Sequence, residues 1–168
     1  MELKLVTGET TPILLSPSVR VSFPLASEVR DLIESMVPQM RRSKGIGLAA
    51  NQVGRSERLC TVEVVPGDVR VYINPEIISL GRDKVLFEEG CLSLPGEFYS
   101  IIRHEKVTVK YQDATGKTHK EAATGLLAIC LQHELDHLAG TLICDRYALQ
   151  KEERERALQD QSISGRLD

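Results

Sequence analysis

The sequence predicts an α+β fold in which small mixed or antiparallel β-sheets pack around a central helix, with a further helix near each end of the chain. Three features indicate this: an early amphipathic segment, a run of strand-like segments, and an apolar, proline-free segment after them. Strands that follow one another, rather than alternating with helices, are typical of the α+β class. The 168 residues contain no internal repeat or linker, so we expect a single domain over residues 1–168.

The first expected element is an amphipathic helix from Ser27 to about Met40, because apolar residues recur there at helical spacing. Ser27 is the expected N-cap, and the acidic residues Glu28 and Asp31 in the first turn suit the positive end of the helix dipole. Pro38 interrupts the pattern, so we expect it to kink the helix near its end.

The middle of the chain is expected to form strands, and these occupy residues 59–65, 69–73, 84–89 and 106–111. The last strand alternates clearly between apolar and polar residues and precedes a turn at 113–116. Near the C-terminus, residues 147–159 are dense in Lys, Arg and Glu and predict an exposed helix, followed by a frayed tail over 162–168. Residues 148–168 are therefore expected to be an exposed C-terminal helix and tail.

The central helix is expected over residues 124–139, which are rich in Leu and Ala and precede Gly140, a suitable C-terminal cap. Its apolar residues leave no wide polar stripe, so most of the helix should be buried. It carries an HExxH pattern, in which His133 and His137 project from one face with the spacing that two imidazoles need to bind one metal ion. Buried polar groups need a partner, which a metal supplies, and Glu134 is then the natural base for a metal-bound water.

Two histidines do not hold a catalytic metal, so a third ligand is needed. A metzincin protease would place a histidine where this chain has Ile143, which closes that route. A thermolysin-like enzyme would use a later glutamate, but Glu152, Glu153 and Glu155 lie in a charged stretch that looks solvated. The cysteines remain as candidates.

The four cysteines differ in their setting. Cys91 follows Gly90, which permits close backbone approach, and a thiolate displayed there could meet the helix face. Cys130 shares the helical face of the histidines, but its short side chain is expected to line a pocket beside the metal. Cys60 and Cys144 are expected to be small buried hydrophobic residues.

Three separated segments stand in a fixed order: Gly-Ile-Gly-Leu-Ala-Ala-Asn-Gln-Val-Gly at 45–54, Glu-Gly-Cys-Leu-Ser-Leu-Pro at 89–95 and Gln-His-Glu-Leu-Asp-His-Leu-Ala-Gly at 132–140. Together they resemble the peptide deformylase family, and the resemblance covers roughly residues 12–150. It implies one divalent ion per chain, held by Cys91, His133 and His137 with water in the fourth position. The family ion is usually Fe²⁺, replaceable by Ni²⁺, Co²⁺ or Zn²⁺, whereas a thiolate with two imidazoles would by itself favour Zn²⁺.

The resemblance also implies the activity, which is hydrolytic removal of the formyl group from the N-terminal formylmethionine of nascent polypeptides, with release of formate. Glu134 would take the proton of the attacking water. The side-chain amide of Gln52 and the backbone N–H of Leu92 would donate to the oxyanion.

A methionine pocket follows from the same resemblance, lined by Ile46, Phe87, Leu126, Ile129, Cys130 and His133. The backbone of Ile46, Gly47 and Gly90 would pair with the peptide as an added strand. Considered without the resemblance, Ile46, Leu126 and Ile129 would be ordinary core residues. Phe98 stands where many members carry an arginine, and Ile102 where a proline often precedes Arg103, so contacts beyond the methionine are expected to differ.

Composition agrees with a small cytoplasmic enzyme. A net charge of −3 gives no broad basic face, so we expect no direct nucleic-acid site. The sequence shows neither a targeting signal nor a run of ~18 apolar residues, so no membrane partner is expected. Four cysteines without paired spacing are typical of a reducing compartment. The expected partners are N-formylmethionyl nascent peptides, with a transient ribosome contact through the C-terminal helix.

Two alternatives belong to other classes. A metal-dependent peptidase would cut internal amides, but the third histidine of such enzymes is missing here. A non-catalytic relative would keep the fold as a binding module. Loss of Gln52, Cys91 or Glu134 would have indicated such a module, and all three are present.

Overall fold

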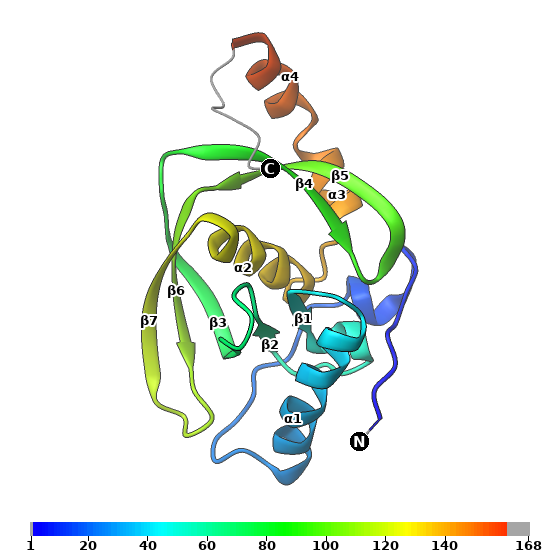
Figure 1. Ribbon diagram of the computed structural model, residues 1–168, viewed down its shortest axis with the longest axis vertical. Helices are drawn as coiled ribbons and strands as arrows, with labels where there is room; N and C mark the ends of the chain where they lie inside the picture. The colour runs from blue at the N-terminus through cyan, green and yellow to red at the C-terminus, as the bar shows by residue number, and fades with distance from the viewer. Residues whose placement is uncertain (1, 161–168) are drawn as a thin grey trace.

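The computed structural model describes residues 2–160, which form an α+β fold with two antiparallel sheets (Figure 1). The helices are η1 (Pro12–Leu15), α1 (Ser27–Arg42), η2 (Ala50–Val53), α2 (Gly125–Leu138), α3 (Ile143–Leu149) and α4 (Lys151–Asp160). The strands are β1 (Gly47–Ala49), β2 (Leu59–Val62), β3 (Arg70–Leu80), β4 (Lys84–Cys91), β5 (Leu94–His104), β6 (Lys106–Gln112) and β7 (Thr118–Thr124). The predicted fold class is confirmed.

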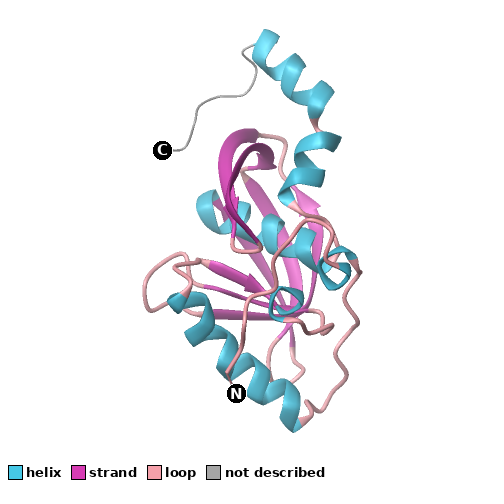
Figure 2. Cartoon of the chain, turned by 90° about the vertical axis from the view of Figure 1, so that its right-hand side faces the viewer, coloured by secondary structure: helices cyan, strands magenta, loops and turns pink. Residues whose placement is uncertain are grey.

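The two sheets surround α2. One sheet has the strand order β1-β2-β3-β6-β7 and the other is the hairpin β4-β5. Helix α2 contacts strands of both sheets and lies at the centre of the molecule (Figure 1). Helix α1 lies at one end and helices α3 and α4 at the other (Figures 1 and 2). The sequence prediction of sheets packed around a central helix is therefore confirmed.

Helix α1 forms where predicted, but Ser27 is not its cap. The extended residue before the helix is Ala26, whose carbonyl accepts from the N–H groups of Val29 and Arg30. Ser27 is the first helical residue, and its hydroxyl donates to Glu28 instead. The helix continues through Pro38 to Arg42. Its buried face, which includes Leu32, Met36 and Met40, packs on Leu48 and Leu59 of the larger sheet.

Three strands were not predicted, and each lacks the usual pattern. Strand β1 is only three residues long, β5 begins with Leu94-Pro95-Gly96, and β7 is the polar segment Thr118–Thr124. Strand β3 also continues to Leu80, beyond the predicted end at residue 73, through a register shift after Ile73. There Asn74 has a positive φ of 51°, and its side chain bonds to both backbone groups of Val21 at 2.8 Å.

Helix α2 begins and ends close to the prediction. Gly140 follows its last turn with a positive φ of 77°, as expected of a residue just beyond a helix C-terminus. A Cβ at this position would lie 2.6 Å from the carbonyl oxygen of Leu15, so close packing also requires glycine.

The C-terminal region differs from the prediction in two ways. It forms two helices, with a break at Gln150, whose side chain bonds to both backbone groups of Ile102. It is also not wholly exposed, because Arg154 is buried against the ring of Tyr147. The tail predicted at 162–168 lies outside the described residues. Cys60 is buried as predicted, whereas Cys144 is only partly buried.

No helix within residues 2–160 is long and apolar enough to cross a lipid bilayer.

Candidate metal centre and active-site cleft

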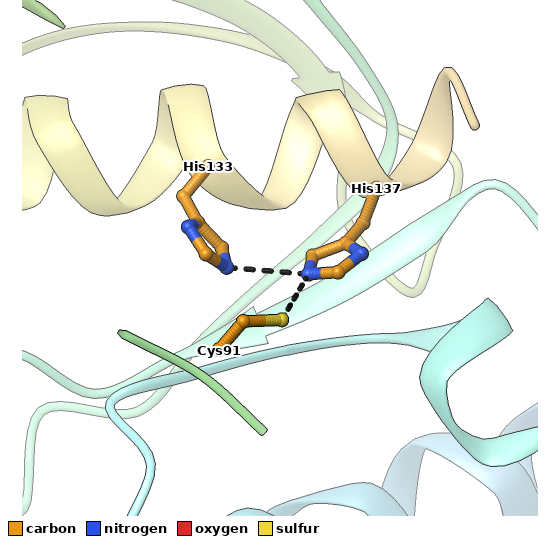
Figure 3. Close-up of side chains that lie close together, drawn as sticks. All are labelled: Cys91, His133 and His137. Carbon is orange, nitrogen blue, oxygen red and sulfur yellow. Dashed lines mark hydrogen bonds between the residues drawn. The ribbon is translucent and has the colours of Figure 1, made fainter. Parts of the chain in front are cut away.

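Three donor side chains converge where β4 ends beside α2. The ligand atoms of Cys91, His133 and His137 all lie within 4.8 Å of one another. The Nε2 atoms of the two histidines are 3.2 Å apart, and Nε2 of His137 is 3.2 Å from Sγ of Cys91. Figure 3 shows both imidazole rings extending from the helix toward the thiol. The structure therefore brings together the three residues that the sequence predicted as metal ligands.

The local structure explains this convergence. His133 and His137 are four residues apart on α2, so their rings lie one turn apart on the same face. Cys91 is the last residue of β4, and the pairing of β4 with β5 shifts register between Gly90 and Cys91. Alternation along β4 directs Cys91, like Glu89, to the buried face, where the thiol meets the helix.

The donors fit a divalent metal ion. A tetrahedral ion with typical metal–nitrogen bonds holds its nitrogen ligands about 3.4 Å apart, close to the separation seen here. In the protein without a metal ion, burial lowers the pKa of both imidazoles. Hydrogen bonds to Cys91 and Glu89 nevertheless raise the pKa of His133 above its usual value. Burial and the charge of His133 hold the pKa of His137 well below its usual value. A metal ion binds imidazole in its neutral form, so protonation of His133 would compete with the ion, whereas burial keeps His137 neutral.

Glu134 lies beside these donors with an unsatisfied carboxylate. The residue is 3% exposed, and its Oε2 atom has no hydrogen-bond partner among the described residues. Burial raises the pKa of Glu134 to about 7, although the charge of His133 opposes this. A Cβ at Gly47 would lie 2.8 Å from Cδ of Glu134, so the glycine leaves the room that the carboxylate occupies. The position and the pKa of this group suit a proton carrier near neutral pH.

Gln52 presents its amide to the same place. Its Oε1 accepts from the backbone N–H of Ala49 at 2.9 Å, which fixes the orientation of the carboxamide. Its Nε2 then points toward Cys91, 3.8 Å from Sγ, and donates to Ser93 at 3.3 Å. Ser93 was not predicted from the sequence. Leu92 lines the cleft beside them.

A buried charge network supports His133, and sequence reasoning missed it. Nδ1 of His133 lies 2.8 Å from Oε2 of Glu89. Arg103 donates one hydrogen bond to each carboxylate oxygen of Glu89, at 2.6 Å to Oε1 and 2.9 Å to Oε2. Arg103 donates in addition to Asp136 at 2.7 Å, and Asp136 accepts from Arg146 of α3. Strand alternation could have shown this, because it places Glu89 on the same face of β4 as Cys91.

Because of Glu89, the chelator-treated protein should become less stable as the pH falls. Burial raises the pKa of Glu89, but hydrogen bonds from Arg103 and His133 outweigh burial and lower it to about 2, from an ordinary value of 4.5. The folded state therefore favours the carboxylate. The resulting stabilisation is complete above about pH 4.5 and is lost as the pH falls toward 2.

The expected size of this stabilisation is on the order of 3 kcal/mol. Denaturant unfolding of Glu89→Gln and the unmodified chain, both with EDTA, should give a difference in unfolding free energy that is at least twice as large at pH 6.5 as at pH 3. A difference that does not change with pH would contradict this assignment.

A cleft of about 630 Å³ opens onto the metal centre. All predicted substrate-binding residues line it, namely Ile46, Gly47, Phe87, Gly90, Leu126, Ile129 and Cys130. Gln52, Cys91, Leu92, His133 and Glu134 also line it, whereas His137 lies behind them. Because His133 faces the cleft, its side chain is 13% exposed rather than fully buried as predicted. Phe98, which the sequence linked to contacts beyond the methionine, also lines the cleft, as do Glu88, Glu97 and Lys44, which were not predicted.

Two unpaired strand edges border the cleft. Within residues 2–160, strand β1 is at the edge of the five-stranded sheet and β4 pairs with β5 alone. Gly47 of β1 and Gly90 of β4 both line the cleft. An extended peptide between them could therefore pair with backbone groups on both sides.

Comparison with known proteins agrees with this geometry. The family model for polypeptide deformylase matches residues 3–154. The chain belongs to the polypeptide deformylase family. A peptide deformylase of Afipia carboxidovorans is 42% identical over 155 residues, covering 88% of this chain and 90% of the relative.

Solved structures of the family match the fold. A peptide deformylase from Thermotoga maritima gives a TM-score of 0.82 at 36% identity, covering 87% of this chain and 97% of that one. A class I type b peptide deformylase from Acinetobacter baumannii bound to Met-Ala-Ser gives 0.81 at 32% identity, covering 87% and 98%. As a peptide deformylase, the chain is a metal-dependent hydrolase that removes the formyl group from the N-terminal formylmethionine of nascent polypeptides.

Proposed function

We propose that Cys91, His133 and His137 hold one divalent ion at the floor of the cleft and that Glu134 carries the proton of the deformylation reaction. The observation that supports this most directly is the convergence of the three donors beside a buried carboxylate. When bound, such an ion supplies Lewis-acid polarisation and lowers the pKa of water toward 7. We infer Fe²⁺ as the ion in the cell, with Zn²⁺, Ni²⁺ or Co²⁺ able to replace it in purified protein.

Glu134 would act first as a base and then as an acid. Its unsatisfied Oε2 takes a proton from the water that attacks the formyl carbon. The same oxygen then gives the proton to the nitrogen of the departing amine, which leaves as a free N-terminus while formate is released. A nearby cation favours the carboxylate form, so Glu134 begins the reaction as a base.

Gln52 and Leu92 would stabilise the negative charge that develops on the formyl oxygen. The amide of Gln52 is oriented by Ala49 and Ser93, so its N–H group is held in place before the substrate binds. The backbone N–H of Leu92, next to Cys91, would be the second donor. Donors fixed in advance stabilise a transition state without reorganising during the reaction.

The substrate would bind as an added strand between β1 and β4. The methionine side chain would enter the apolar part of the cleft formed by Leu126, Ile129 and Cys130. The backbone of Ile46, Gly47 and Gly90 would pair with the peptide. The Met-Ala-Ser bound to the Acinetobacter baumannii relative has a methionine at its start, which supports binding of a peptide that begins with methionine here.

A formate-release assay with formyl-Met-Ala-Ser tests this function. The anaerobically purified protein should release formate from this peptide and leave the internal amides of unformylated Met-Ala-Ser intact. Cleavage of internal amides would favour a metal-dependent peptidase, and binding without turnover would favour a non-catalytic module. We place the reaction in the cytoplasm, because nascent chains with formylmethionine are made there.

A transient ribosome contact through the C-terminal helix stays a prediction. Helix α4 carries three basic and four acidic residues, so its charge does not by itself attract RNA. A chain that ends at Gln150 would lack α4 but keep the pairing of Gln150 with Ile102. If α4 makes the contact, this truncated chain should lose ribosome co-sedimentation and keep its deformylase activity. Unchanged co-sedimentation would contradict the prediction.

A further inference from the structure

Phe98 leaves an aromatic ring in solvent at the mouth of the cleft. It is 66% exposed, whereas Phe23 and Phe87 are both partly buried. Phe98 lines the cleft, and so do the exposed side chains of Ile46 and Leu126. Apolar area gathered beside a binding cleft indicates contact with a ligand.

The ring of Phe98 lies over Gly90. The two residues are directly paired across β4 and β5. A Cβ at Gly90 would lie 2.9 Å from Cε1 and 3.3 Å from Cδ1 of the ring. The ring thus occupies the space of the missing side chain on β4, and it lines the cleft that this strand borders.

The alternation of β4 shows which substrate residue would meet this ring. Glu89 and Cys91 are buried, whereas Glu88 and Gly90 lie on the exposed face. A peptide added to β4 alternates in the same way. With its methionine side chain directed inward to Leu126, the next side chain points outward, to the face that carries Phe98.

We propose that Phe98 is a specificity-determining residue that contacts the side chain immediately after the formylmethionine. The ring favours substrates with an aromatic or aliphatic residue at that position, because contact between two apolar side chains removes both from water. This inference rests on the proposed binding of a formylated peptide along β4.

The test compares kcat and KM for formyl-Met-Phe-Ser and formyl-Met-Ala-Ser. The unmodified protein should prefer the phenylalanine peptide by about 3- to 10-fold in kcat/KM. Phe98→Ala should abolish most of this preference, and Phe98→Leu should keep part of it. The change should appear in KM, with kcat unchanged, because the ring does not reach the reacting atoms.

Two controls make the result specific. Leu149→Ala removes an apolar side chain of similar exposure outside the cleft and should leave the preference intact. Formyl-Met-Ala-Phe moves the aromatic residue one position along, and its KM should not depend on Phe98. An equal preference in Phe98→Ala and the unmodified chain would overturn the inference, as would a dependence on Phe98 at the third position only. If none of the peptides released formate, the proposed function would be overturned, and this inference with it.

Discussion

Replacing Glu134 with glutamine should lower kcat by about 10²- to 10⁴-fold, the range expected when a general base is lost. The substitution keeps the shape of the side chain but removes the atom that carries the proton. Glu134 is buried and its Oε2 has no hydrogen-bond partner among residues 2–160, so a neutral amide should not destabilise the fold through loss of a pairing. Formate release and calorimetric unfolding of the same preparation would measure both effects.

Metal content separates this outcome from loss of the site. Glu134 is not one of the three converging donors, so Glu134→Gln should bind as much metal as the unmodified chain. Glu155→Gln, a change on the exposed surface of α4, serves as the matched control and should keep full activity. A Glu134→Gln protein with full metal content and nearly full activity would contradict the assigned role.

Replacing Cys91 with alanine should weaken metal binding by more than about 10²-fold and reduce activity with it. Even the loss of a group that only orients a ligand typically costs 10- to 100-fold in affinity, so the loss of a ligand should cost more. The remaining pair, His133 and His137, offers two nitrogen atoms and no thiolate. Metal analysis after anaerobic purification, followed by titration with Co²⁺, measures the loss directly, because a thiolate–Co²⁺ bond absorbs strongly.

Cys144→Ala is the matched control for this substitution. Cys144 is a free, partly buried cysteine that does not line the cleft. Its replacement should leave both metal content and the thiolate absorption band unchanged. If Cys91→Ala retained the band, or Cys144→Ala lost it, the proposed ligand set would be wrong.

Two of the three donors could be predicted from a local pattern. His133 and His137 lie four apart on one helix, and helical geometry alone places their rings together. Cys91 is different, since periodicity left it only as a candidate and its selection came from resemblance to the family. Its approach to the histidines depends on where the end of β4 lies relative to α2, and no local pattern specifies this.

The groups that support the site were harder to predict. Glu89, Arg103 and Asp136 form their network across two strands and a helix. Each residue taken alone resembles a surface charge, because partners distant in sequence remove the cost of burying it. Two strands were hard to predict for the same reason. β5 and β7 have little apolar alternation, and their extended backbone is stabilised by pairing with β4 and β6.

By itself, the sequence determined the fold class, the helix that carries the histidines and the family motifs. Each of these can be recognised from residues that are close along the chain. Only the tertiary structure decided that Cys91 meets that helix, that Glu89 holds His133, and that Phe98 covers Gly90 at an open strand edge. Those contacts join residues from different elements. Their geometry is set by how whole strands and helices pack, which no short stretch of sequence specifies.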